Sequence, residues 1–87
     1  GHVGDGNFHA TPLVDMSDPG EVARTAEFIS WLNDLAISMD GTCTGEHGIG
    51  QGKMPYLRRE LGDAVDFMAQ IKNALDPKGI LNPGKVI

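Results

Sequence analysis

Glycine is concentrated in two short stretches, and this uneven distribution limits where regular structure can form. Of the 12 glycines among the 87 residues, eight lie within residues 1–6 and 41–52. Glycine loses more backbone freedom on folding than any other residue, so both stretches are expected to form loops and turns. All three histidines, His2, His9 and His47, also lie in or beside these glycine-rich stretches.

The segment between the two stretches has the spacing of an amphipathic helix. Its apolar side chains recur every three or four positions, at residues 22, 26, 29, 32, 36 and 39. This spacing is typical of a helix with one buried face. Ser17 or Asp18 is expected to cap its start, and Gly41 is expected to end it in the left-handed conformation.

The remainder of the chain predicts two shorter helices and little else that is regular. One helix is expected over residues 54–61, and another opens at Gly62-Asp63 and continues to residue 75. A turn at residues 76–79 then leads into an extended tail. Short strands are expected at residues 8–14 and 42–45, because both segments have β character.

This order of elements, strand, helix, strand, helix, indicates an α+β fold that the chain does not complete. Two short strands are too few to cover the apolar faces of the helices. Further strands are therefore expected upstream or in a partner chain, where Trp31 and Met39 would fill a core. The absence of an initiator Met suggests a piece of a longer protein, and its exposed helix faces are expected to drive self-association.

The bulk composition excludes several classes of partner. The net charge is −5, with 7 basic and 12 acidic residues and no basic run, which argues against binding to nucleic acid. No apolar stretch approaches the roughly 20 residues of a membrane span. Cys43 is the only cysteine, so no internal disulfide framework is possible. A cytoplasmic location is expected, with a membrane-peripheral or a mitochondrial one left open.

The first glycine-rich stretch contains two candidate metal ligands. His2 and His9 are seven residues apart, an odd separation that places them on opposite faces of a regular strand. The intervening glycines permit a tight turn that would bring both rings to one side. Converging neutral imidazoles suit Zn²⁺ or another divalent metal. The alternative is a plain turn with two incidental histidines, in which Asn7 is a turn former rather than a ligand contact.

The second glycine-rich stretch places a carboxylate beside an imidazole. In extended backbone Glu46 and His47 point to opposite sides, which favours a third metal ligand and a separate acid or base. The alternative is a surface ion-pairing motif. Gly45, Gly48 and Gly50 remove side chains where another group, such as a ring, could approach closely.

Three motifs occur in a defined order along the chain. They are GHVGDGNFH at residues 1–9, TGEHGIG at residues 44–50 and LDPKGILNPGK at residues 75–85. The combination resembles the C-terminal end of FAD-linked 2-hydroxy-acid dehydrogenases of the vanillyl-alcohol-oxidase type. That group includes D-lactate dehydrogenases, glycolate oxidase catalytic subunits and D-2-hydroxyglutarate dehydrogenases. The resemblance covers essentially the whole chain.

The resemblance implies a fold and a division of domains. Residues 1–87 would form part of a ferredoxin-like α+β substrate or cap domain with a C-terminal helix and an extended tail. The FAD-binding domain would lie outside the chain, so the chain alone is expected to be inactive. A stand-alone metal-binding or interaction module is the alternative of a different class.

The resemblance also implies roles for individual residues. His2, His9 and Glu46 would bind a divalent metal, usually zinc, which holds the hydroxyl and carboxylate of the substrate. His47 would lie near the flavin and take the hydroxyl proton, while hydride from the α-carbon passes to flavin N5. The candidate cofactor contacts are Gly48 and Asn82. Asn82 lies in a stretch that resembles one returning toward the flavin domain.

The substrate is narrowed by one departure from the pattern. In the hydroxyglutarate enzymes an Asn that contacts substrate stands where this chain has Thr11. Val3 and Phe8 are more similar to the D-lactate type, so D-lactate is the expected substrate, with glycolate and D-2-hydroxyglutarate as alternatives. Asn7 and Thr11 are the candidate substrate contacts. The sequence does not identify the electron acceptor.

Overall fold

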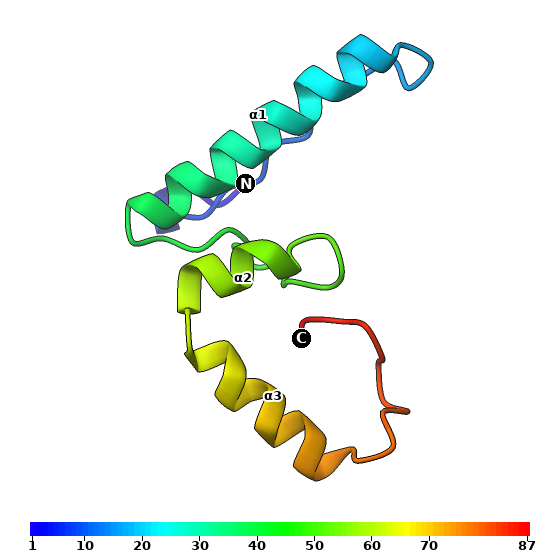
Figure 1. The fold of residues 1–87 in the computed structure, drawn as a ribbon. Coiled ribbons are helices and arrows are strands. Elements are labelled where there is room, and N and C mark those ends of the chain that lie inside the picture. The colour runs from blue at the N-terminus through cyan, green and yellow to red at the C-terminus, as the bar shows by residue number, and fades with distance from the viewer. The chain divides into compact units, whose positions relative to one another are not determined.

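The computed structural model describes all 87 residues, which divide into two units, Gly1–Glu46 and His47–Ile87. The first unit contains a 3-10 turn, η1 (Val3–Asp5), and the long helix α1 (Pro19–Ser38). The second contains helices α2 (Met54–Leu61) and α3 (Ala64–Leu75), followed by the tail (Figure 1). The three helices expected from the sequence are confirmed. None of them is both long enough and apolar enough to cross a membrane.

Helix α1 begins at an aspartate cap. The Asp18 carboxylate accepts the N–H groups of Gly20 at 3.0 Å and Glu21 at 3.3 Å. Pro19 occupies the first turn, where its missing N–H would have had no helical partner. The cap expected at this position is therefore confirmed.

The end of α1 differs in one residue from the sequence prediction. Asp40, not Gly41, adopts the left-handed conformation, with φ of 62°. Its N–H donates to the Ile37 carbonyl at 3.0 Å, and the Gly41 N–H donates to the Ala36 carbonyl at 2.8 Å. This pair of bonds places the left-handed residue one position before the glycine. Gly41 also avoids a tight contact, because a Cβ there would lie 3.0 Å from the Ala36 oxygen.

Replacing Asp40 with Gly should stabilise the protein by about 0.5–1 kcal/mol. Relief of the left-handed penalty of about 1–2 kcal/mol is partly offset by the greater freedom of glycine in the unfolded chain. Thermal unfolding followed by circular dichroism measures the change. The matched variant Gly41→Ala should lower the melting temperature, and a lower melting temperature for Asp40→Gly would contradict the assignment.

The two strands expected from the sequence do not form in this structure. Residues 8–14 and 42–45 are irregular, and the β pairing present is an isolated bridge between His2 and Asn7. A strand needs a neighbour for its N–H and C=O groups, and neither segment has one in this chain. The regular structure is helical, and the expected α+β ferredoxin-like class is not confirmed.

The apolar face of α1 remains open to solvent. Trp31 is 57% exposed and Met39 is 72% exposed, so the prediction that they fill a core is wrong for this chain. The rings of Phe28 and Trp31 contact each other with centroids 5.9 Å apart, but little covers them. The buried apolar residues are Cys43, Leu57 and Val65. This pattern agrees with the expectation that further structure covers the helices.

In the second unit α2 and α3 contact each other across a sharp corner. Helix α2 ends at Gly62, which has φ of 56° and donates its N–H to the Arg58 carbonyl at 2.7 Å. The Arg58 guanidinium donates to Asp66 of α3 at 2.8 Å, and this hydrogen bond lowers the pKa of the Asp66 carboxyl. Both side chains are more than half exposed, so the pair contributes little to stability.

Helix α3 ends at a buried carboxylate. Asp76 is 7% exposed, pairs with Lys72 one helical turn earlier, and accepts the N–H groups of Ile80 at 3.1 Å and Leu81 at 2.9 Å. These contacts, foremost the one with Lys72, lower the pKa of Asp76 to about 2. The turn expected here is confirmed by a 3.0 Å bond from the Gly79 N–H to the Asp76 carbonyl.

Candidate active site

The first glycine-rich stretch forms the tight turn that the sequence predicts. The His2 carbonyl accepts the N–H groups of Asp5 at 2.9 Å and Asn7 at 3.2 Å, which closes the chain around η1. Gly6 takes the left-handed conformation at the end of this turn, with φ of 73°, as glycine does without steric cost. His2 and Asn7 are thereby paired across the turn.

Two side chains of this turn, those of His2 and Asn7, lie close to the Glu46 carboxylate. His2 Nε2 lies 3.6 Å from Glu46 Oε2, and Asn7 Nδ2 donates to the same oxygen at 3.5 Å. The side chains of His2 and Glu46 are 61% and 49% exposed. A ligand from solvent can therefore reach the carboxylate from the side that the turn leaves open.

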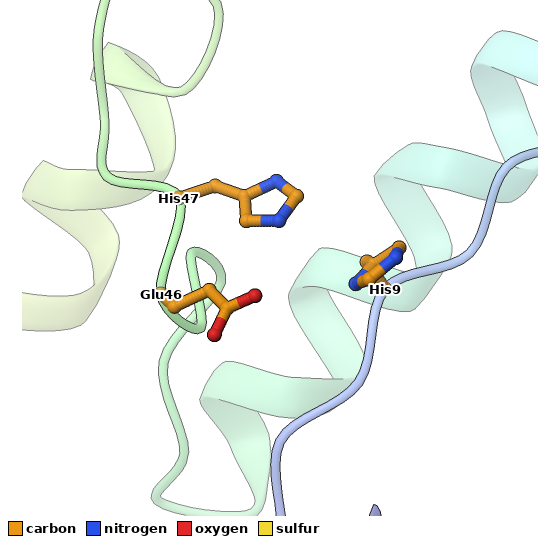
Figure 2. A group of neighbouring side chains, drawn as sticks. All are labelled: His9, Glu46 and His47. Atoms are coloured by element: carbon orange, nitrogen blue, oxygen red, sulfur yellow. The ribbon is translucent and has the colours of Figure 1, made fainter. Parts of the chain in front are cut away.

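His9 approaches the same carboxylate from the segment that follows the turn (Figure 2). A ring nitrogen of His9 and a carboxylate oxygen of Glu46 lie within 4.8 Å of each other. Both histidines expected from the sequence as metal ligands thus face the glutamate expected as the third. The three residues belong to the first structural unit, Gly1–Glu46.

His47 follows Glu46 directly, and the two side chains do not diverge as the sequence predicts. A ring nitrogen of His47 lies within 4.8 Å of the Glu46 carboxylate. The prediction of opposite sides assumed extended backbone, whereas Gly45 and Glu46 form a turn in which Gly45 has φ of 53°. The division of labour between Glu46 and His47 therefore rests on the family resemblance and not on strand geometry.

The contact between Asn7 and Gly45 is a feature that the sequence analysis missed. A Cβ on Gly45 would collide with Asn7 Oδ1, so glycine here makes room for the amide that hydrogen-bonds Glu46. Gly48 and Gly50 have positive φ values of 83° and 54°, and their Cβ positions face open space. No local signal links positions 7 and 45, because the contact arises only when the two glycine-rich stretches meet.

The other predicted site residues differ in how they lie relative to Glu46 and in exposure. Thr11 is in the irregular segment after His9, and Asn7 is half-buried against the glutamate. Gly48 and Asn82 belong to the second unit, where Asn82 is left-handed with φ of 44°. The structure therefore brings Asn7 to the candidate metal ligands, and it leaves Thr11 open to solvent.

The residues around Glu46 fit a divalent metal in type. The ligand atoms that all lie within 4.8 Å of one another are those of His9, Glu46 and His47, a group that does not include His2. Catalytic zinc sites use three protein ligands from imidazole and carboxylate groups and keep one position open. Two ligands that each bind zinc at about 2.1 Å in a tetrahedral site lie about 3.4 Å apart. The 3.6 Å between His2 and Glu46 is close to that value, and His9 lies within 4.8 Å of Glu46. The same 3.6 Å also suits an ion pair when His2 is protonated.

Residues 1–86 match the family described as FAD linked oxidases, C-terminal domain. The match takes in all three motifs and both glycine-rich stretches. The chain belongs to this family. Membership of the FAD-linked oxidases confirms the resemblance drawn from the motifs, while metal ligation and the roles of single residues stay predictions.

Individual relatives are similar over nearly the whole chain. The sequence is 53% identical to a protein of Arabidopsis thaliana named D-lactate dehydrogenase (cytochrome), mitochondrial, with 99% of this chain covered. It is 48% identical to D-lactate dehydrogenase (cytochrome) 1, mitochondrial, of Saccharomyces cerevisiae, and 44% identical to the glycolate oxidase subunit GlcD of Bacillus subtilis, each again over 99% of the chain. The chain spans only 15%, 14% and 18% of the lengths of these curated relatives.

Proposed function

We propose that this chain is the C-terminal part of a flavin-dependent 2-hydroxy-acid dehydrogenase that acts on D-lactate. The observation that carries the proposal is the match of residues 1–86 to the C-terminal domain of FAD-linked oxidases. The relatives named D-lactate dehydrogenase, at 53% and 48% identity, support D-lactate as the substrate. The glycolate oxidase subunit at 44% identity supports glycolate as the second candidate, and D-2-hydroxyglutarate is the third.

The proposal assigns the missing structure to the rest of a longer protein. The FAD-binding domain would lie outside these residues, so the chain alone would be inactive and its exposed apolar faces would drive self-association. Residues 8–14 and 42–45 would become strands once a neighbouring sheet edge satisfies their backbone groups, which completes an α+β cap domain. The protein would act in the cytoplasm or, like the two relatives named mitochondrial, in mitochondria.

In this proposal His2, His9 and Glu46 hold a divalent metal, with zinc as the first candidate. A bound divalent ion supplies Lewis-acid polarisation, which lowers the pKa of a coordinated hydroxyl group. Asn7 orients the glutamate, because its amide donates to the Glu46 oxygen that faces His2. Thr11 and Asn7 remain the candidates for direct contact with the substrate.

His47 is the proposed base for the hydroxyl proton. Its side chain is exposed, and an imidazole exchanges protons readily near neutral pH. As the C–O double bond of the 2-oxo acid forms, the hydroxyl proton passes to a ring nitrogen of His47 and the α-hydrogen leaves with its electron pair. Bound FAD supplies the two-electron acceptor for that hydride. Gly48 and Asn82 are the proposed cofactor contacts from this chain.

A substrate panel on the full-length protein tests the proposal. D-lactate should bleach the flavin absorption at least tenfold faster than glycolate or D-2-hydroxyglutarate at equal concentration. L-lactate is the matched control, because it presents the α-hydrogen on the opposite face, and it should be inactive. Faster bleaching by glycolate would show that glycolate, not D-lactate, is the substrate. The absence of bound flavin would overturn the proposal.

A further inference from the structure

The tail after α3 is held at two points, with Asn82 between them. Near α3, Asp76 binds the backbone of Ile80 and Leu81. At the far end, the Val86 N–H donates to the Gly50 carbonyl at 2.7 Å. Figure 1 shows the tail, drawn in orange to red, running from the far end of α3 back in the direction of α2. All of these residues belong to the second unit, His47–Ile87.

Lys72 and Asp76 together fix both polar groups of Leu81. The Leu81 N–H donates to Asp76 Oδ2 at 2.9 Å, and the Leu81 carbonyl accepts from Lys72 Nζ. That carbonyl is part of the planar peptide unit that joins Leu81 to Asn82. The orientation of this plane sets where the N and Cα atoms of Asn82 lie, so the Lys72–Asp76 pair constrains the point from which the Asn82 side chain leaves the tail.

The pair is unlike an ordinary surface salt bridge. The side chains of Lys72 and Asp76 are 30% and 5% exposed, so water and salt screen the interaction weakly. Asp76 also accepts two backbone N–H groups, from Ile80 and Leu81, so the pair is tied to the tail as well as to α3. Asn82 itself holds φ of 44°, in the left-handed region that asparagine adopts more readily than most other non-glycine residues.

The far end of the tail connects to the second glycine-rich stretch. Gly50, which accepts the Val86 N–H, lies two residues after Gly48 and three after His47. The segment that carries Asn82 and the loop that carries Gly48 are therefore joined by a direct backbone bond. Both predicted cofactor contacts of this chain lie on this one linked structure.

We propose that Lys72 and Asp76 are positioning residues that orient the Leu81–Asn82 peptide so that Asn82 reaches the flavin together with the loop of Gly48. The inference rests on the proposed function for the identity of the bound group. The role of the Lys72–Asp76 pair in holding the tail does not depend on the proposed function, because it can be measured without flavin. Lys72 and Asp76 touch neither substrate nor cofactor in this proposal.

The first test measures, in the full-length protein, how strongly the Lys72–Asp76 pair protects the tail amides from hydrogen exchange. In Lys72→Met, hydrogen exchange of the Ile80 and Leu81 amides should accelerate at least tenfold, while exchange in α2 stays unchanged. Lys78→Met is the matched control, because it removes an exposed lysine from the same turn, and it should exchange like the wild type. Unchanged exchange at residues 80 and 81 in Lys72→Met would overturn the proposal.

The second test asks whether the hold matters for the cofactor. Lys72→Met should raise the flavin dissociation constant about tenfold, the scale of one lost charge-assisted hydrogen bond. Lys72→Arg should restore it to within about threefold of wild type, because a guanidinium can still bridge Asp76 and the Leu81 carbonyl. Faster exchange with unchanged flavin affinity would overturn the positioning role.

A double variant keeps the proposal testable if the single variant does not fold. Removing Lys72 alone leaves the Asp76 carboxylate buried without its cation, which is costly. The pair Lys72→Met with Asp76→Asn removes both charges, and it should show the same rise in exchange and in flavin dissociation constant. A full-length wild type that binds no flavin would overturn the proposed function, and the exchange result alone would then decide whether the pair holds the tail.

Discussion

Replacing Glu46 with Gln in the full-length protein should weaken zinc binding by more than about 100-fold. Changes one shell away from a metal weaken binding by about 10–100-fold, and Glu46 is the carboxylate that both His2 and His9 face. A neutral amide is a poor zinc ligand, while its shape preserves the hydrogen bond from Asn7. Metal content after dialysis against a chelator of known affinity measures the loss.

Two further variants serve as an intermediate case and as a control for the effect of Glu46→Gln on zinc binding. Asn7→Ala leaves the three ligands in place but removes the amide that orients Glu46, so it should weaken zinc binding by about 10–100-fold. Glu27→Gln removes an exposed carboxylate from α1 in the same unit, and it should leave binding unchanged. Since Glu46 is half exposed, Glu46→Gln should fold normally by circular dichroism. Full zinc content in that variant would show that the glutamate is not a ligand.

The helices could be predicted from the sequence because their signals are local. Apolar spacing between residues 22 and 39, the cap at Asp18 and the proline in the first turn all lie within a few residues of the elements they define. The strands could not be predicted correctly for this chain, since a strand exists only when another segment satisfies its backbone. Trp31 was expected in a core, but in this chain it stays 57% exposed, because burial of an apolar helix face also needs a neighbouring segment.

The candidate site was predictable in its residue types but not in its geometry. The glycines of the first stretch indicated a tight turn, and the structure has that turn, while the convergence of His2 and His9 on a metal stays a prediction. A Cβ on Gly45 would collide with the side-chain oxygen of Asn7, 38 positions earlier in the sequence, and no pattern within either stretch indicates this contact. The opposite-charge spacing of Lys72 and Asp76 was available as a signal, yet only the fold shows that it reaches Leu81.

Replacing His47 with Ala should slow reduction of the flavin by D-lactate at least 100-fold and leave zinc in place. Loss of a general base typically costs 10²–10⁴-fold, whereas the three proposed metal ligands are His2, His9 and Glu46. Stopped-flow measurement of flavin bleaching gives the rate, and metal analysis of the same sample gives the zinc content. A near-normal rate would exclude His47 as the base.

Loss of zinc together with loss of rate would instead make His47 a metal ligand. A ring nitrogen of His47 lies within 4.8 Å of the Glu46 carboxylate, so the roles of base and metal ligand must be distinguished. Added imidazole distinguishes the two roles, because it can accept the proton from the cavity left by the shortened side chain but cannot replace a protein ligand held on the backbone. Partial recovery of the rate with imidazole, at constant zinc content, is the expected result for a base. Gln51 is exposed and lies in the same loop, so Gln51→Ala should change neither the rate of flavin reduction nor the zinc content. A change in either would show that disturbing the loop, and not removing the imidazole, causes the loss.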